Sequence, residues 1–130
     1  MQVLFVEDDA MNRRVVKDML GVAGVDMFEA PEAQTGLDMI SANDFDLILM
    51  DLRMPGMDGL TAIREIRRRS DAKARLPVIV ITADTGVSIR ADCEAAGADD
   101  LLLKPVAMDR LFEAIGRILA RTEGAAATLN

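Results

Sequence analysis

The sequence contains no histidine, tryptophan or tyrosine, and it has a single cysteine, Cys93. The absence of histidine excludes histidine-ligated metals, histidine general bases and a phosphohistidine carrier. One cysteine cannot form a disulfide bond within the chain, which favours the reducing environment of the cytoplasm. Cys93 lies on an apolar helical face in the sequence pattern, so we expect a buried and unreactive thiol.

Basic residues and long apolar runs are also limited. The chain has 15 Lys and Arg residues against 22 Asp and Glu residues, which gives a net charge of −7. Such a chain is a poor general binder of DNA because phosphate contacts need clustered basic side chains. No apolar run reaches the length of a membrane span, and the segment Met1 to Val6 lacks the features of a signal peptide. We therefore expect no DNA binding, no membrane insertion and a cytoplasmic location.

Short apolar runs alternate with segments of helical spacing. The runs predict strands at Val3–Val6, Asp26–Glu29, Leu47–Met50, Val78–Ile81 and Leu101–Leu103. Apolar residues at helical spacing fill the intervals: Met11, Val15, Leu20 and Ala23; Ala33, Leu37 and Ile40; Leu60, Ile63 and Ile66; Ile89, Cys93 and Ala96; and Met108, Leu111, Phe112, Ile115, Ile118 and Leu119. Five such units predict an α/β fold, a five-stranded parallel sheet with helices on both faces. We expect one domain over residues 1–121 and a flexible C-terminal tail over residues 122–130.

Polar side chains follow four of the predicted strands. Glu7 and Asp8 follow the first strand, Asp51 the third, Thr82 the fourth and Lys104 the fifth. The carboxyl ends of parallel strands lie at one edge of the sheet, where open α/β folds place their binding crevice. The sequence therefore predicts that carboxylates, a hydroxyl and an ammonium group converge there.

These residue types suit phosphoryl transfer. Bunched carboxylates repel one another, and a divalent cation such as Mg²⁺ relieves that repulsion through oxygen ligands. An aspartate can attack phosphorus as a nucleophile and become an aspartyl phosphate. A cation and an ammonium group neutralise charge on the transferring group, and a hydroxyl can donate a hydrogen bond to it.

Four pieces of the chain carry a resemblance to a known family: Val6–Asp9, Asp51–Gly59, Ile81–Ala83 and Lys104–Pro105. With them, the chain from about Val3 to about Leu119 resembles the receiver domain of bacterial two-component response regulators. The resemblance implies a flavodoxin-like fold with strand order 2-1-3-4-5. It also implies a phosphoacceptor switch whose only catalysis is its own phosphorylation and dephosphorylation. A sensor histidine kinase or a phosphotransfer protein would donate the phosphoryl group.

The resemblance also implies a role for each matching residue. Asp51 matches the phosphoacceptor, and Glu7, Asp8, Asp51 and the backbone carbonyl of Arg53 match the Mg²⁺ ligands. The other matches are Thr82 for the switch hydroxyl, the Ala83 amide for a phosphoryl contact, Lys104 for the phosphate-contacting lysine and Pro105 for a proline after a cis bond. Arg53 and Asp84 occupy positions that tune the lifetime of the phosphoryl group, and their opposite charges predict an ion pair across the mouth of the site.

Leu101 departs from the family pattern. Receiver domains usually carry Tyr or Phe three residues before the lysine, and rotation of that ring is coupled to movement of the threonine. Leu101 cannot repeat this switch in the same form, so a leucine rotamer change or a shift of the helix near Ile89–Ala96 would replace it.

Our leading interpretation is a single-domain response regulator, a monomer or weak dimer. It would bind a downstream protein through its fourth helix, fifth strand and fifth helix. A receiver module of a hybrid histidine kinase and an unphosphorylated pseudo-receiver scaffold are alternatives. A Mg²⁺-dependent phosphatase with Asp51 as its nucleophile is disfavoured. Enzymes of the haloacid dehalogenase type begin their site with an Asp-x-Asp motif, and Arg53 occupies the position of the second aspartate. The basic cluster between Arg64 and Arg75 is read as a solvated surface, with an anion or nucleotide site as the alternative.

Overall fold

The computed structural model describes the backbone of residues 1–129 and the side chains of residues 1–121. Over this range, strands and helices alternate in the order β1 (Gln2–Val6), α1 (Ala10–Val22), β2 (Asp26–Ala30), α2 (Ala33–Ala42), β3 (Leu47–Asp51), α3 (Gly59–Arg67), the 3₁₀ helix η1 (Ala72–Arg75), β4 (Val78–Thr82), α4 (Ile89–Ala96), β5 (Asp100–Leu103) and α5 (Met108–Leu129). The prediction of a flexible tail over residues 122–130 concerns Asn130 and side chains that lie outside the described residues, so it stays a prediction.

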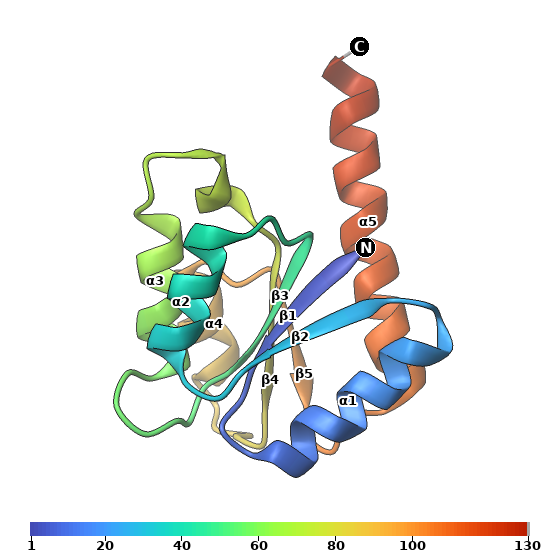
Figure 1. Cartoon of the computed structure of the whole chain (residues 1–130). Helices are drawn as coiled ribbons and strands as arrows, with labels where there is room; N and C mark the ends of the chain where they lie inside the picture. The colour runs from blue at the N-terminus through green and yellow to red at the C-terminus, as the bar shows by residue number, and fades with distance from the viewer. Residues whose placement is uncertain (130) are drawn as a thin grey trace.

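The strands form one parallel sheet with the order β2-β1-β3-β4-β5, as the sequence predicts. Because the order reverses at β1, the connections after β1 and after β3 run in opposite directions, and helices cover both faces. Figure 1 shows α2, α3 and α4 on one side of the sheet and α1 and α5 on the other. Two apolar layers result, one on each face.

The central strands are apolar throughout because both of their faces are covered. Every residue of β3 and β4 is buried, and their side chains alternate between the two layers: Ile48 and Val80 face α2–α4, whereas Leu49 and Ile79 face α1 and α5. The five predicted strands are confirmed, each longer by about one residue. Asp51 and Thr82 are thus the last residues of β3 and β4, held by the sheet itself.

The predicted buried face of α1 is confirmed at Leu20 and wrong at its other three positions. Met11 and Val15 are 71% and 43% exposed, and Ala23 is an exposed residue that follows the helix, whereas Val16 and Leu20 are buried. The Asp9 side chain accepts hydrogen bonds from the backbone N–H groups of Met11 and Asn12, and this cap fixes where the helix begins. At the first turns of the helix, the buried position is Val16 instead of Val15, one residue or about 100° around the helix from the predicted one.

The other predicted helix faces are confirmed, with two exceptions in α5. Met108 and Leu119 are exposed, and the buried stripe of this helix is Leu111, Ala114, Ile115 and Ile118. Cys93 is buried on α4, and its burial raises the pKa of the thiol, as expected for an unreactive cysteine. No helix in the described part of the chain is both long and apolar enough to cross a membrane.

Candidate phosphorylation site

The carboxyl ends of the strands bring the predicted residues together around one hollow. Glu7 and Asp8 follow β1, Asp51 ends β3, Thr82 ends β4 and Lys104 follows β5. All five line a hollow of about 210 Å³, together with Asp9, Asn12, Arg53 and Ala83. Residues as far apart in the sequence as Glu7 and Lys104 are neighbours only because parallel strands end at the same edge of the sheet.

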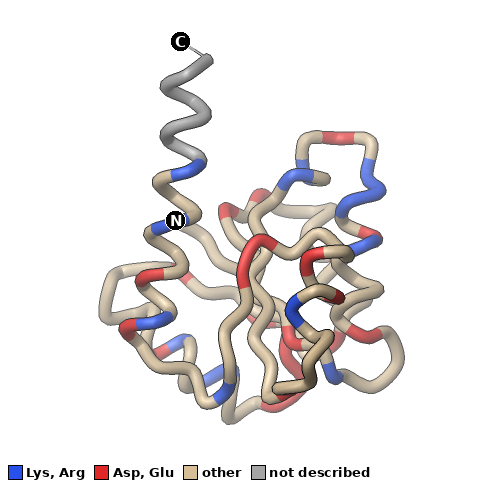
Figure 2. The backbone as a smooth tube through the Cα atoms, turned by 180° about the vertical axis from the view of Figure 1, so that it is seen from behind, with Lys and Arg blue, Asp and Glu red and all other residues tan. Residues whose placement is uncertain are grey.

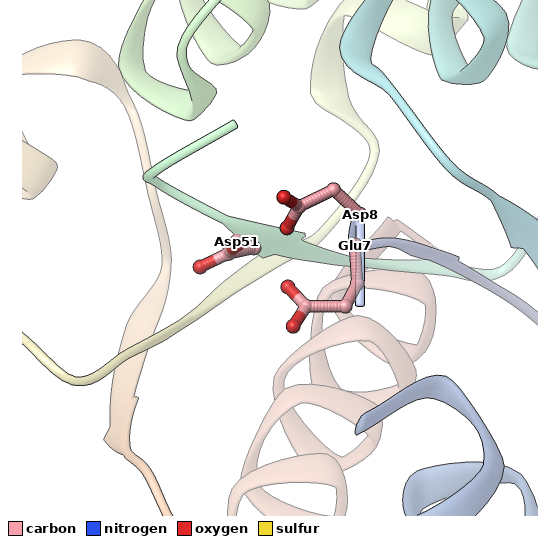
Figure 3. Close-up of side chains that lie close together, drawn as sticks. All are labelled: Glu7, Asp8 and Asp51. Carbon is pink, nitrogen blue, oxygen red and sulfur yellow. The ribbon is translucent and has the colours of Figure 1, made fainter. Parts of the chain in front are cut away.

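Lys104 is the positive centre of this group. Its Nζ lies 3.0 Å from Glu7 Oε1, 3.3 Å from Glu7 Oε2 and 3.2 Å from Asp51 Oδ1. Glu7 and Asp51 are buried, at 0% and 3% exposure, whereas Asp8 is exposed. Figure 3 shows the Glu7 and Asp8 carboxylates on the same side of the end of β1, with the Asp51 side chain beside them. The reactive carboxylate is therefore shielded on one side and open on the Asp8 side.

Burial and crowding control the protonation of Glu7. Desolvation is the largest cause, and together with its contact with Asp51 it raises the pKa of Glu7 from 4.5 to about 7, against hydrogen bonds from Asn12 and Lys104. Burial alone would lower the pKa of Lys104, but hydrogen bonds and charges from Glu7 and Asp51 outweigh it and raise that pKa. The site thus stores unfavourable negative charge that one lysine only partly neutralises.

This surplus of carboxylates fits a hard divalent cation. One oxygen each from Glu7, Asp8 and Asp51 lies within 4.8 Å of the others, and these oxygens are the donor type that Mg²⁺ prefers. A cation here would offset the burial and the contact with Asp51 that together raise the pKa of Glu7. The predicted role of the Arg53 backbone carbonyl as a further ligand stays a prediction.

The loop after β4 is hydrogen-bonded back to Thr82. The Thr82 side chain is buried, and its Oγ1 accepts a hydrogen bond from the backbone N–H of Asp84 at 3.1 Å. Asp84 Oδ1 in turn accepts from the backbone N–H of Gly86 at 2.8 Å. A change in the orientation of the Thr82 hydroxyl would therefore alter the contacts that hold this loop. Ala83, between them, lines the hollow.

The predicted ion pair across the mouth of the site is confirmed. Arg53 Nη2 lies 2.8 Å from Asp84 Oδ2 and joins the loop after β3 to the loop after β4. The hydrogen bond from Arg53 is the largest cause that lowers the pKa of Asp84. The Arg53 side chain is 80% exposed to solvent, so the pair is a surface interaction that water can break.

Leu101 and Pro105 lie on either side of Lys104 in the sequence. Leu101 is on β5, and Pro105 follows the strand. Leu101 is 9% exposed and belongs to the apolar layer beneath α2, α3 and α4, next to a small cavity of about 30 Å³ that Cys93 also lines. The Lys104–Pro105 peptide bond is cis, as the resemblance implies. A leucine in this position leaves the surface between α4 and α5 without an aromatic ring.

The basic cluster on α3 and η1 is largely structural. Figure 2 shows Lys and Arg gathered over this end of the molecule. Arg67 donates to the carbonyl oxygens of Gly97, Ala74 and Leu76, and Lys73 donates to those of Ile40 and Asn43. These contacts join α3 to its neighbours.

Two other arginines of the cluster have acidic partners. Arg68 pairs with Glu65, and Arg69 pairs with Asp71. With four of its basic side chains engaged in this way, the cluster favours the reading of an ordinary protein surface over that of an anion site.

Two further residues support the site and are absent from the set predicted from the sequence. Asn12 donates from Nδ2 to Glu7 Oε1 at 2.7 Å, and Gly59 packs directly behind the backbone of Asp51. An asparagine on the same helical face as Val16 and Leu20 was a usable signal for the first. The role of Gly59 depends on the close approach of the start of α3 to the end of β3, which no local sequence pattern reveals.

Comparisons with known proteins agree with this geometry. A family model described as the response regulator receiver domain matches residues 3–116. The cell cycle transcriptional regulator CtrA of Caulobacter vibrioides is 30% identical over 124 residues, and the response regulator MprA of Mycobacterium avium is 36% identical over 123 residues. Each alignment covers 95% of this chain, but only 52% and 53% of those proteins. The chain therefore spans about half the length of the curated relatives it matches.

Solved structures show the same likeness. The chemotaxis protein CheY4 of Vibrio cholerae superposes with a TM-score of 0.84 at 27% identity, over 90% of this chain and 97% of that one. A response regulator receiver protein from Pseudomonas putida gives a TM-score of 0.81 at 34% identity, over 89% and 95% of the two chains.

Proposed function

The chain belongs to the response regulator receiver domains, and from that premise we propose that it receives a phosphoryl group on Asp51 in a two-component phosphorelay. Receiver domains act as phosphoacceptor switches, and they interact with histidine kinases or phosphotransfer proteins. The observation that carries the proposal is the contact of a single lysine, Lys104, with two buried carboxylates, Glu7 and Asp51, at the carboxyl end of the sheet. We propose a cytoplasmic location, in keeping with these donors.

The proposed chemistry is an in-line displacement. An oxygen of the Asp51 carboxylate attacks phosphorus, a new O–P bond forms, and the bond from phosphorus to the donor atom breaks with its electron pair staying on the donor. Lys104, already 3.2 Å from Asp51, neutralises charge on the phosphoryl oxygens. Receiver domains bind Mg²⁺ at an acidic pocket, and here Glu7, Asp8, Asp51 and the Arg53 carbonyl would hold the ion. When bound, Mg²⁺ supplies further positive charge to those oxygens.

The proposed switch begins at Thr82. An aspartyl phosphate adds about −1.5 to −2 charge and strong acceptor oxygens. The Thr82 hydroxyl, which now accepts from Asp84 N–H, and the Ala83 amide would donate to those oxygens instead. The loop after β4 then changes its contacts, and it biases α4 toward a second arrangement. Leu101 would follow by a change of rotamer rather than by rotation of a ring.

The output surface that we propose lies over α4, β5 and α5. A hollow of about 400 Å³ there is lined by Leu101, Leu103 and Pro105, with Arg90 and Arg110 at its sides. Eleven of the 15 lysine and arginine side chains of the chain, all within the described residues, pair with a carboxylate, but Arg90 and Arg110 do not. Unpaired cations beside exposed leucine favour a downstream protein that presents apolar and acidic groups.

Three alternatives differ in context or in chemistry. A receiver module of a hybrid kinase would use the same site within a longer chain. A pseudo-receiver scaffold would never be phosphorylated, but a buried carboxylate pair around a lysine is costly to keep without a use. A phosphatase would turn over small phosphate esters, and Arg53 in the second position of the motif disfavours it.

Incubation with acetyl phosphate and Mg²⁺ tests the proposal. Intact mass spectrometry should find one added phosphoryl group on the wild type and none on Asp51→Asn or in EDTA. A folded wild type that gains no mass from acetyl phosphate or from a phosphorylated histidine kinase would leave the scaffold alternative as the better account.

A further inference from the structure

The residue that the proposed chemistry leaves unused is Asn12. It lies in the first turn of α1, half-buried, and its Nδ2 donates to Glu7 Oε1 at 2.7 Å, a shorter distance than either contact of Glu7 with Lys104. Asn12 and Lys104 both line the acidic hollow and also an apolar pocket of about 120 Å³ between α1 and the segment after β5. Asn12 therefore occupies the wall between the reactive carboxylates and the core.

The Glu7 carboxylate has two competing partners. Lys104 Nζ lies 3.0 Å from one of its oxygens and 3.3 Å from the other, so the lysine already forks across the carboxylate, unevenly. A tighter and more even pair would satisfy Glu7 further, and it would leave the lysine less available to Asp51. Asn12 offers a second donor to Oε1 alone, and this donor opposes rotation of the carboxylate about its last bond.

Both ends of this contact are held firmly by other interactions. The Asn12 backbone N–H donates to the Asp9 side chain at 3.1 Å, which fixes the start of α1. The backbone carbonyl of Glu7 accepts a hydrogen bond from Arg13 Nη1 at 2.7 Å, and Arg13 also pairs with Glu29. With the main chain of Glu7 anchored by Arg13, the remaining freedom lies in its long side chain, and Asn12 is the uncharged group that restrains it.

We propose that Asn12 is a positioning residue that holds the Glu7 carboxylate in an orientation open to a divalent cation and keeps it from turning further toward Lys104. The proposal rests on the function proposed above, because it gives Glu7 the part of a cation ligand. Removing a group that orients a metal ligand through a hydrogen bond commonly weakens metal affinity by about 10- to 100-fold.

Isothermal titration of the metal-free, unphosphorylated protein with MgCl₂ tests this directly. Asn12→Ala and Asn12→Leu should each weaken Mg²⁺ binding about tenfold. Asn12→Leu keeps the branched shape of the side chain and has a higher helix propensity than asparagine, so equal losses in the two variants assign the effect to the lost donor and not to a weaker helix. Met11→Ala is the matched control, because Met11 lies beside Asn12 on α1 and is 71% exposed. Wild-type affinity in Asn12→Leu would overturn the proposal.

A double-mutant cycle with Glu7→Asp separates positioning from a general structural role. Shortening the side chain by one methylene, roughly 1.5 Å, takes the carboxylate out of reach of Asn12. Asn12→Leu should then cost Mg²⁺ affinity in the wild type but not in the Glu7→Asp background. An equal loss in both backgrounds would show that Asn12 acts through the stability of α1, and it would refute the proposal.

Phosphorylation by acetyl phosphate gives a second readout that distinguishes this inference from the proposed function. In Asn12→Leu the rate should be low at limiting Mg²⁺ and should return toward the wild-type rate at saturating Mg²⁺. A wild type that binds Mg²⁺ but takes no phosphoryl group would refute the proposed function while the titration still decides the role of Asn12. A rate that stays low at saturating Mg²⁺ would contradict a role in cation binding alone.

Discussion

Replacing Gly59 by alanine should both destabilise the fold and damage the phosphorylation site. A Cβ atom at this position would lie 2.2 Å from the backbone oxygen of Asp51 and 2.9 Å from the Cα of Leu52. These neighbours are main-chain atoms of the buried end of β3, which cannot rotate away as a side chain can. The start of α3 and the end of β3 would have to separate by about 1 Å.

The cost follows from the geometry of that contact. Gly59 does not have a positive φ, so alanine adds no backbone strain and the whole effect is steric. Overpacking of a buried contact typically costs 1–3 kcal/mol, and the rigid neighbours place this case near the upper end, about 2–3 kcal/mol. A displacement of about 1 Å at a reacting group can also lower a rate by about 100-fold.

Urea denaturation and acetyl phosphate labelling measure the two effects on the same protein. Gly116→Ala is the matched control, because a Cβ there meets nothing within 4 Å in the middle of α5. It should raise the free energy of unfolding by about 0.5–1 kcal/mol. If Gly59→Ala were as stable as the wild type and labelled at the same rate, the close packing behind Asp51 would not matter as described.

Three further predictions follow from contacts elsewhere in the molecule. Arg67→Ala should lower the free energy of unfolding by about 2–4 kcal/mol in urea titrations, because it removes the donor to three carbonyl groups, two in or just after η1 and one after α4. Arg67→Lys should not restore it, and full rescue by lysine would contradict the fork of hydrogen bonds. Because folding raises the pKa of Glu7 from 4.5 to about 7, the folded protein binds this proton more tightly. In metal-free buffer, the stability of the wild type relative to Glu7→Gln should therefore fall as pH rises through that range, by no more than about 1.4 kcal/mol per pH unit, and a flat difference would disprove the cause. Arg53→Ala should speed loss of the phosphoryl group about twofold or more by opening the ion pair with Asp84, whereas an unchanged rate of dephosphorylation would show that the pair does not limit access of water.

The sheet and the ends of its strands were predictable from the sequence because each signal is local. An apolar run such as residues 47–50 ends in a carboxylate, and the parallel arrangement then places Asp51 beside Glu7 without any knowledge of tertiary contacts. The ion pair between Arg53 and Asp84 was predictable from their opposite charges at positions that the resemblance to receiver domains places at the mouth of the site.

Other features depend on contacts that the sequence does not encode locally. Val15 and Val16 are equally apolar, so hydrophobic spacing does not tell which of them faces the sheet, and only the packing of α1 against the sheet shows that it is Val16. In the sequence, Arg67 is one charge of a basic cluster, and its structural role depends on carbonyl groups up to 30 residues away. Likewise, the value of Asn12 is visible only once the direction of the Glu7 side chain is known.

Mapping the phosphorylated residue is the measurement that tests the central claim most directly. After labelling with acetyl phosphate and Mg²⁺, borohydride reduces an aspartyl phosphate to homoserine, which peptide mass spectrometry locates in the sequence. The account predicts conversion at residue 51 alone, and none when Mg²⁺ is withheld. Conversion at Asp8 or another carboxylate, or none in a folded protein that a histidine kinase also fails to label, would contradict it.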